Sequence, residues 1–308
     1  MENKKPLIVI AGPTASGKTS AGIALAKKIG GEIISADSMQ VYKYMDIGSA
    51  KVKKEEMEGI PHHLIDVLDP KEEFNVTVFK RLAEEALSGI YERGNIPIVA
   101  GGTGFYIQAL VRDIDFTENT GDKSYRRLLE EKARKEGGPE YLHRLLSKKD
   151  PLSAERIPVN NVKRVIRALE FYEETGIPIS VHNDREKEKE SPYDLSYFVL
   201  SPEREILYKR IDERVDRMME EGLLEETRFL MDYGCQREMT SMQGLGYKQL
   251  YAHLLGEMSL AEAVDEIKLQ TRHFAKRQLT WFRREAGAVF TDPLKENLTD
   301  VFEIRHNG

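Results

Sequence analysis

The chain has 308 residues, a formal net charge of −6 and one cysteine, Cys235. This length exceeds the usual range of a single domain, so we expect one α/β domain with a large insertion, or two domains. The negative charge excludes a general basic field, so a nucleic-acid partner would have to meet a local basic patch. A single cysteine excludes an intramolecular disulfide framework and a cysteine-rich zinc site. No apolar run is long enough to span a bilayer, and we expect a cytoplasmic protein without a membrane partner.

Strands and helices alternate in the first part of the chain. Short apolar runs rich in Ile and Val predict strands at residues 7–11, 31–36 and 96–100. Helical patterns cover residues 19–29 and 76–91. This alternation is typical of a parallel sheet whose strands are joined by crossover helices, and it predicts an α/β fold.

The pattern then changes to charged segments of helical period. Residues 116–195 contain Gly-Gly-Pro and Asp-Pro breaks and no convincing strand, which predicts a helical insertion. Residues 197–200 restore a strand pattern, a long and mostly helical stretch follows, and residues 288–290 fit a last edge strand. We therefore expect a core made of residues 1–115 and 196–308, with C-terminal helices, and a separate helical insertion domain.

A phosphate-binding pattern joins the first predicted strand to the first predicted helix. The segment reads Gly12-Pro13-Thr14-Ala15-Ser16-Gly17-Lys18-Thr19 and fits G-x-x-x-x-G-K-[ST], the P-loop. Its glycines let the backbone fold around a di- or triphosphate, and N–H groups at the helix N-terminus face the anion. Lys18 is suited to neutralise phosphate oxygens, and the Thr19 hydroxyl is a ligand for Mg²⁺. The pattern does not say which phosphate ester is bound.

An acidic residue follows the second predicted strand rather than the third. The third strand leads into Gly101-Gly102-Thr103-Gly104, whereas Asp37 follows the second. Motor NTPases usually place an acid after a later strand to orient water, so this order favours group transfer to a bound acceptor over hydrolysis. Carboxyl ends of parallel strands share one edge of the sheet, so Asp37 can reach a substrate beside the phosphates. A role for Asp37 as a helix cap stays open.

A basic stretch without acidic residues lies near the C-terminus. It contains an aromatic pair, Trp281-Phe282, and the basic residues Lys268, Arg272, Lys276, Arg277, Arg283 and Arg284. At helical spacing, four of these share one face: Lys268, Arg272, Lys276 and Arg283. Such a face can follow an RNA backbone, and a solvated basic face is the open alternative.

Several short segments, taken in order, carry a family resemblance. Besides residues 12–19 they are Asp37-Ser38-Met39-Gln40-Val41-Tyr42, Met45-Asp46-Ile47-Gly48-Ser49-Ala50-Lys51, Pro61-His62-His63-Leu64-Ile65-Asp66, Gly101-Gly102-Thr103-Gly104-Phe105-Tyr106 and Ala275-Lys276-Arg277-Gln278-Leu279-Thr280-Trp281-Phe282-Arg283. Together they resemble the bacterial tRNA dimethylallyltransferases over nearly the whole chain. The resemblance implies transfer of a dimethylallyl group from dimethylallyl diphosphate to N6 of the adenosine 3′ of the anticodon in tRNA, with release of pyrophosphate and use of Mg²⁺. The P-loop would then hold the isoprenoid diphosphate rather than ATP.

The resemblance also implies roles for individual residues. Residues 12–19 would bind the diphosphate, with Mg²⁺ on Thr19 and a further contact from Arg214, and Asp37 would be the general base. Expected tRNA contacts are Asp37, Ser38, Met39, Gln40, Thr103, Arg126, Lys163, Arg164, Arg167, Gln243, Gly246, Arg272, Lys276 and Arg283. The insertion is expected to grip the anticodon stem-loop, and no obligate protein partner is implied.

Two other functional classes stay open on the residues alone. A small-molecule or nucleotide kinase shares the P-loop and could use Asp37 as a base toward a hydroxyl, but it would need ATP and an arginine-bearing lid. A nucleotide-switched RNA-binding module without catalysis would leave Asp37 without a purpose.

Overall fold

The computed structural model describes residues 4–116 and 124–307. The chain divides into two compact units. The first, which we call the core unit, contains Met1–Val111 and Ser191–Gly308, and the second, the helical unit, contains Arg112–Glu190. Within the described ranges, no helix combines the length and the apolar character that crossing a membrane requires.

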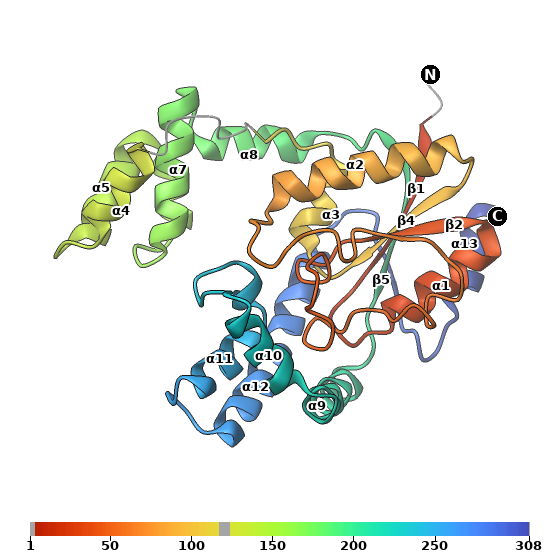
Figure 1. The fold of residues 1–308 in the computed structure, drawn as a ribbon. Coiled ribbons are helices and arrows are strands. Elements are labelled where there is room, and N and C mark those ends of the chain that lie inside the picture. The colour runs from red at the N-terminus through yellow and green to blue at the C-terminus, as the bar shows by residue number, and fades with distance from the viewer. Residues whose placement is uncertain (1–3, 117–123, 308) are drawn as a thin grey trace. The chain divides into compact units, whose positions relative to one another are not determined.

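The core unit is built on a six-stranded sheet in the order β3-β2-β4-β1-β5-β6. Figure 1 labels the longer strands β1, β2, β4 and β5. The strands are β1 (Lys5–Ala11), β2 (Gly31–Ser35), β3 (His62–His63), β4 (Ile96–Gly101), β5 (Tyr193–Leu200) and β6 (Val289–Thr291). All neighbouring strands run parallel, with Ile10 of β1 opposite Ala100 of β4 and Val9 opposite Tyr197 of β5. The expected α/β fold with a parallel sheet is therefore confirmed.

Helices cover both faces of this sheet, which explains the continuous apolar runs of its central strands. In β1, Leu7 and Val9 face a cluster that includes side chains of α2 (Val76–Glu92) and α3 (Gly104–Val111). Ile8 and Ile10 face the opposite cluster, with α1 (Lys18–Ile29) and α13 (Leu298–Asn307) (Figure 1). Burying each of these side chains stabilises the fold by about 1.5–3 kcal/mol.

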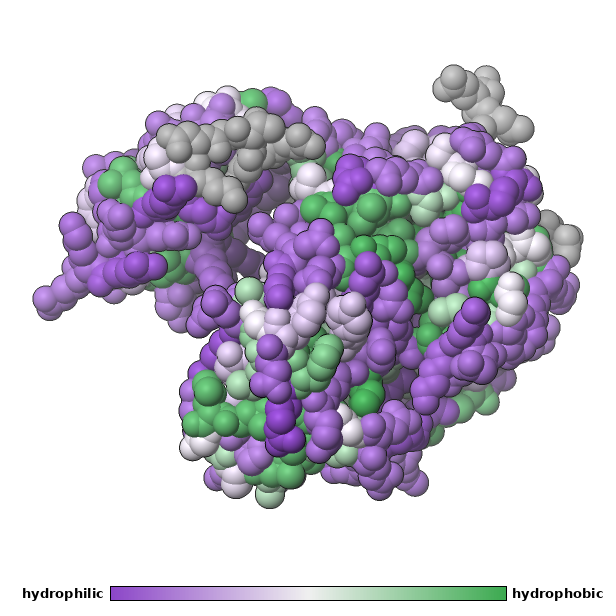
Figure 2. Space-filling view, in the orientation of Figure 1, coloured by the Kyte–Doolittle hydropathy of each residue, from purple (hydrophilic) through white to green (hydrophobic). Residues whose placement is uncertain are grey.

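The C-terminal part of the core unit is helical, as expected. It contains α9 (Arg204–Glu220), α10 (Leu223–Asp232), the 3-10 helix η1 (Ser241–Gln243), α11 (Tyr247–Leu254) and α12 (Leu260–Phe282). The long α12 begins at a capping box formed by Ser259 and Glu262, and it contacts α9, α11 and α3. Figure 2 shows hydrophobic residues at the surface over this helical part, where Phe229, Leu255 and Leu269 are exposed.

The helical unit has its own hydrophobic core. Its helices are α4 (Ser124–Ala133), α5 (Gly138–Lys149), α6 (Pro151–Arg156), α7 (Val162–Thr175) and α8 (Ile179–Glu188). Leu129 of α4, Leu142 and Leu146 of α5, and Ile166 and Leu169 of α7 form the centre of this core. The spacings of three and four residues place each set on one helix face, as the helical period predicted.

A buried carboxylate ties three helices of this unit together. Asp150 is 1 % exposed and lies between α5 and α6. Its oxygens accept hydrogen bonds from the backbone N–H and the hydroxyl of Ser153, at 3.0 and 2.7 Å, and from those of Ser180 in α8, at 3.0 and 2.6 Å. Asp150 therefore caps α6 and holds the start of α8 beside it.

Candidate active site

The P-loop lies between β1 and α1, where the motif places it. Gly12 has φ 151°, and a Cβ there would lie 2.7 Å from the carbonyl oxygen of Leu200. Gly17, the N-cap of α1, has φ 90°. Both positions therefore require glycine. Ala15 also has a positive φ, 61°, which costs an L-residue about 1–2 kcal/mol.

Lys18 crosses the P-loop and has an unusual pKa. Its Nζ donates to the carbonyl oxygen of Pro13 at 2.6 Å. The residue as a whole is half-buried, whereas its ammonium lies deeper among protein atoms. This burial, together with the charge of Arg214, lowers the pKa of Lys18 to about 7, and the carboxylate of Asp37 opposes part of that shift. A bound diphosphate would supply the negative charge that favours protonated Lys18.

Arg214 reaches the P-loop from α9. Its guanidinium Nη1 lies 3.4 Å from the Thr14 hydroxyl, and burial lowers the pKa of Arg214. Buried Ile211 packs with Ala15 of the P-loop, which turns this face of α9 toward the loop. The structure thus brings Arg214, Lys18 and the loop together, although a charged helix read from sequence favours a solvated arginine.

Asp37 lies two residues beyond β2, and its two oxygens have different surroundings. Oδ1 accepts from the backbone N–H groups of Met39, at 2.8 Å, and Gln40, at 3.4 Å. No hydrogen bond reaches Oδ2 from the described part of the chain. Residues 38–41 form bends and turns rather than a helix, so the helix-cap role considered for Asp37 is wrong, and Oδ1 instead closes a turn.

A small cavity joins Asp37 to the P-loop; we call it the Asp37 cavity. Its volume is about 50 Å³. It is lined by Lys18, Thr19, Ile33, Ser35, Asp37, Gln40, Val52, His62, Ile65, Ala100 and Gly101. Its lining combines a basic group, hydroxyls and a carboxylate with apolar side chains, which is the mixture of groups typical of a small-molecule site.

The oxygen-bearing side chains of this cavity suit Mg²⁺. Thr19, Ser35 and Asp37 supply hydroxyl and carboxylate oxygens, and Mg²⁺ is usually held by one or two such ligands together with phosphate oxygens. Within residues 4–116 and 124–307, no three or more His, Cys, Asp or Glu side chains gather into a metal-binding group. A magnesium ion here would therefore depend on the diphosphate for most of its ligands.

Gln40 already has protein partners for its amide. Its Oε1 accepts from the Ser35 hydroxyl at 3.2 Å, and its Nε2 lies 3.3 Å from the carbonyl oxygens of Ser49 and Ala50. Ser38 and Met39 beside it are half-buried. A tRNA contact from Gln40 stays a prediction, and it would have to share these bonds.

Residues 101–104 form a turn after β4 that packs against the segment leading to Asp37; we call it the glycine turn. The N–H of Thr103 donates to the carbonyl oxygen of Ala36 at 3.3 Å, and a Cβ on Gly101 would overlap that same oxygen. On its other side, the turn meets Gln278 of α12, for which the sequence alone implies no role. The burial and the bonds of Gln278 are visible only in the structure, so no signal in the sequence singled it out.

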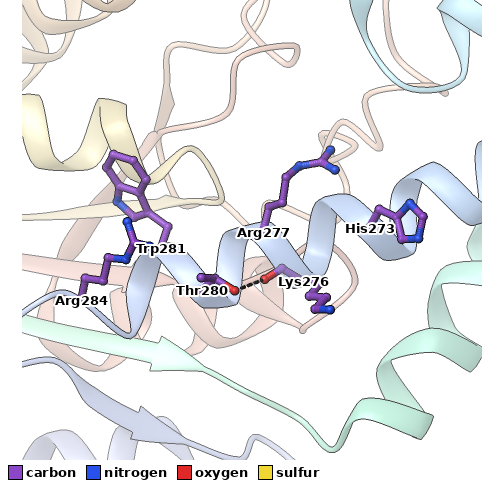
Figure 3. Close-up of a pocket in the computed structure, with 6 residues that line it drawn as sticks. All are labelled: His273, Lys276, Arg277, Thr280, Trp281 and Arg284. Atoms are coloured by element: carbon purple, nitrogen blue, oxygen red, sulfur yellow. Dashed lines mark hydrogen bonds between the residues drawn. The ribbon is translucent and has the colours of Figure 1, made fainter. Parts of the chain in front are cut away.

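A wider cavity runs along α12; we call it the α12 groove (Figure 3). Its volume is about 430 Å³, and it is lined by His273, Lys276, Arg277, Thr280, Trp281 and Arg284. Lys276, Arg277 and Arg284 are exposed. Trp281 packs against the glycine turn, where a Cβ on Gly104 would overlap its ring. The groove therefore combines cations with an aromatic ring next to the turn.

The basic face expected on α12 divides into two parts. Lys268 Nζ lies 2.5 Å from Asp216 Oδ1, and Arg272 Nη1 bonds both oxygens of Asp212 at 2.7 and 2.9 Å. Both aspartates belong to α9, whose acidic side chains at positions 212 and 216 recur one turn apart and face α12. Lys276, by contrast, is exposed, as is Arg283 just after the helix.

The remaining expected tRNA contacts have varied surroundings. In the helical unit, Lys163 and Arg164 are exposed at the start of α7, and the Arg167 guanidinium lies 6.0 Å from the centre of the Phe171 ring. Arg126 forms ion pairs with Glu130 at 3.2 Å and Glu170 at 3.4 Å.

Gln243 and Gly246 lie where η1 leads into α11. Gln243 is exposed, and its Nε2 donates to the Arg237 carbonyl oxygen. Gly246 is buried with φ 98°, next to Leu223. The positive φ requires glycine there.

Comparisons with known proteins agree with this geometry. Residues 40–285 match the family model described as IPP transferase. The chain is 56 % identical over 305 residues to the tRNA dimethylallyltransferase of Lachnoclostridium phytofermentans, covering 97 % of both chains, and 51 % identical over 297 residues to that of Carboxydothermus hydrogenoformans, covering 96 % of this chain and 95 % of the relative.

Solved structures give the same result. The tRNA isopentenylpyrophosphate transferase of Bacillus halodurans aligns with a TM-score of 0.73 and 44 % identity, covering 98 % of this chain and 95 % of that one. A eukaryotic dimethylallyltransferase described as acting on tRNA aligns with a TM-score of 0.84 and 32 % identity, covering 98 % and 79 %. With a P-loop after β1, a carboxylate after β2 and near full-length matches, the chain belongs to the IPP transferase family.

Proposed function

We propose that this chain transfers the dimethylallyl group of dimethylallyl diphosphate to N6 of the adenosine 3′ of the anticodon in tRNA and releases pyrophosphate. The observation that carries the proposal is the pairing of Asp37 with Lys18 and Thr19 in one cavity. A base beside a diphosphate-binding loop is what allylic transfer to an amine requires. The relatives named above, which match nearly full length, support the same activity.

The P-loop would stabilise the leaving group. The allylic carbon–oxygen bond breaks, so negative charge develops on the diphosphate. Loop N–H groups, protonated Lys18 and Arg214 would hold that charge in the transition state. Mg²⁺ bound through Thr19 would add positive charge at the same oxygens.

Asp37 would act on the nucleophile. An exocyclic adenine amine is a weak nucleophile, so its orientation matters more than proton removal alone. Oδ2 of Asp37 would accept a hydrogen bond and then a proton from N6. The bonds from Met39 and Gln40 to Oδ1 would fix the carboxylate in the required direction.

RNA binding would use exposed cations and aromatic surface. A base stacked in the anticodon loop has to be extruded before it can enter a cavity of this kind. The α12 groove offers Lys276, Arg277 and Arg284 to phosphates and the ring of Trp281 to a neighbouring base. In the helical unit, Lys163 and Arg164 at the first turn of α7 suit contact with the stem, and we assign the grip on the stem-loop to this unit. A tRNA substrate agrees with the expected cytoplasmic location.

One experiment separates prenyl transfer from a kinase reaction at the same loop. The protein is incubated with Mg²⁺, unmodified tRNA and either dimethylallyl diphosphate or ATP, and the RNA is weighed by mass spectrometry. We expect a mass increase of one five-carbon prenyl unit and one pyrophosphate for each modified RNA. A requirement for ATP, accumulation of ADP, or an unchanged RNA mass would contradict the proposal.

A further inference from the structure

Gln278 of α12 bonds two separate parts of the proposed active site. Its side chain is buried, at 7 % exposure. Its Oε1 accepts from the N–H of Thr14 in the P-loop at 3.0 Å, and its Nε2 donates to the carbonyl oxygen of Gly102 at 2.9 Å. An amide can accept at one end and donate at the other without carrying charge, so it joins the two loops without disturbing the field at the diphosphate.

The contact with the glycine turn is close. A Cβ on Gly102 would overlap Nε2 of Gln278, and a Cβ on Gly104 would overlap the Trp281 ring. The side chains of Gln278 and Trp281 therefore lie directly against the backbone of the turn. A displacement of α12 or of the turn has to move the other.

The glycine turn also contacts the segment that carries Asp37. The Thr103 N–H bonds the carbonyl oxygen of Ala36, the residue before Asp37, at 3.3 Å. Hydrogen bonds and direct packing thus lead from the diphosphate side, at Thr14, through Gln278 and the glycine turn to the proposed base.

We propose that Gln278 is a positioning residue that sets the separation between the P-loop and the segment carrying Asp37. The inference rests on the proposed function, because it takes the diphosphate to bind at the P-loop and the adenine at Asp37. Group transfer needs the amine and the allylic carbon in line at reacting distance, and a misplacement of about 1 Å can cost about 100-fold in rate. Without the Gln278 bonds, each half of the site still binds its substrate, but the two substrates no longer meet correctly.

The same helix carries the α12 groove on its exposed side. Arg277 and Trp281 of the groove are one and three residues from Gln278. RNA bound in the groove and the loops held by Gln278 therefore share one rigid element. This arrangement lets the helix fix the RNA relative to the diphosphate.

The test replaces Gln278 with a side chain of similar length that cannot form these bonds, Gln278→Met. The matched control is Gln270→Met on the same helix, where the amide Nε2 bonds the Glu266 carboxylate at 2.9 Å, one turn away on the same helix. Single-turnover prenyl transfer is measured with both substrates saturating, and the Kd values for tRNA and for pyrophosphate are measured separately. We expect Gln278→Met to lower the transfer rate by about 10- to 100-fold, with both Kd values within about 2-fold of the parent. Gln270→Met should leave all three quantities unchanged.

Two results would overturn the inference. One is an unchanged single-turnover rate in Gln278→Met. The other is a loss that higher substrate concentration restores, because that would make Gln278 a binding residue only. If Gln278→Met does not fold, Gly102→Ala tests the same contact from the opposite side, and it should also lower the saturated rate without weakening pyrophosphate binding.

Hydrogen exchange separates failure of this inference from failure of the proposed function. With pyrophosphate bound, backbone amides of residues 12–19 and 101–104 should exchange faster in Gln278→Met than in Gln270→Met. This readout needs no prenyl transfer. Equal exchange in the two variants would overturn the positioning role, whereas a wild-type protein that transfers no prenyl group would contradict the proposed function instead.

Discussion

The two oxygens of Asp37 differ in their partners, and two substitutions separate their roles. Asp37→Asn keeps an acceptor for the N–H groups of Met39 and Gln40 but removes the base. We expect it to lower single-turnover prenyl transfer by about 100-fold or more, the lower limit of what a positioned base contributes, with pyrophosphate binding intact. Asp37→Ala should show the same loss and also lower the free energy of unfolding by about 1 kcal/mol, because the hydrogen bonds that close the turn are lost. A parent-like rate in Asp37→Asn would remove Asp37 from the chemistry.

The lowered pKa of Lys18 predicts how the affinity for diphosphate depends on pH. Burial lowers its pKa to about 7 in the free protein. Only the protonated form attracts a diphosphate, so above that pH binding must take up a proton, and the affinity falls by up to about tenfold per pH unit. Calorimetry with pyrophosphate in two buffers of different ionisation enthalpy measures this proton uptake.

The control for that measurement is Lys18→Arg, whose guanidinium stays charged throughout the range. After correction for the titration of pyrophosphate itself, we expect no proton uptake in this variant. Equal uptake by the parent and by Lys18→Arg would show that another group titrates.

At the scale of elements, α12 has a paired half and an exposed half. We expect the double variant Lys276→Ala with Arg277→Ala to weaken tRNA binding and to reduce the slope of log Kd against log salt by about 0.7–0.9 for each lost phosphate contact. Lys268→Ala is the control, because Lys268 is paired with Asp216 of α9. The slopes are measured from tRNA titrations at several salt concentrations. Equal slopes for the parent and the double variant would show that the α12 groove is a solvated surface that does not contact RNA phosphates.

Asp150 is expected to control the stability of the helical unit. Burial on its own raises the pKa of Asp150, but hydrogen bonds from Ser180 and Ser153 outweigh it, and the pKa lies below its usual value. The stabilisation is therefore present above the unfolded pKa of about 4 and is lost as the pH falls through the folded value. Asp150→Ala should lower the free energy of unfolding of this unit by about 3 kcal/mol at neutral pH, and by less in acid.

Urea unfolding at the two pH values checks this expectation. Glu173→Ala provides the control, because Glu173 is half exposed and pairs with Lys149 at the surface, where such a pair contributes about 0–1 kcal/mol. A loss for Asp150→Ala no larger than that for Glu173→Ala would contradict the role of the buried network.

Elements with a strong local pattern could be predicted, and those that depend on packing could not. The strand that the sequence predicts at residues 31–36 differs from β2 by one residue at its end, because the apolar run is buried on both faces and is therefore easy to recognise. The strand expected at 197–200 begins earlier, at Tyr193, because its first residues pair with β1 although they are only partly buried. The two-residue β3 carries no pattern of its own.

The same distinction applies to the candidate site. The P-loop pattern fixes Gly12, Gly17, Lys18 and Thr19 at set spacing, so a phosphate-binding loop could be predicted from the sequence. The contact between Arg214 and Thr14 depends on which face of α9 packs inward, and the bonds of Gln278 join residues 264 positions apart in the chain. No local pattern encodes such pairings, so they required the structure.

For the whole molecule, the division into two units predicts that ligands stabilise them separately. Pyrophosphate at about 100 times its Kd should stabilise the core unit by about 2.7 kcal/mol, because it binds the P-loop in the folded state only. The helical unit, whose core contains no residue of the P-loop, should be unaffected. Hydrogen exchange of β1 and β4 should slow on addition of pyrophosphate, while that of α5 and α7 should not. Equal protection in both units, or protection that persists in Lys18→Ala, would contradict this expectation.

Both edges of the sheet are very short. The outer strands, β3 and β6, contain two and three residues. An edge strand exposes a row of unpaired N–H and C=O groups that can recruit a strand from another molecule, and a long edge is a common starting point for aggregation. Here the two outer strands offer only a few such groups, so they provide little template for intermolecular strand addition. Self-association through strands would first require opening of the sheet to expose the apolar central strands, which ties the solubility of this enzyme to its folding stability.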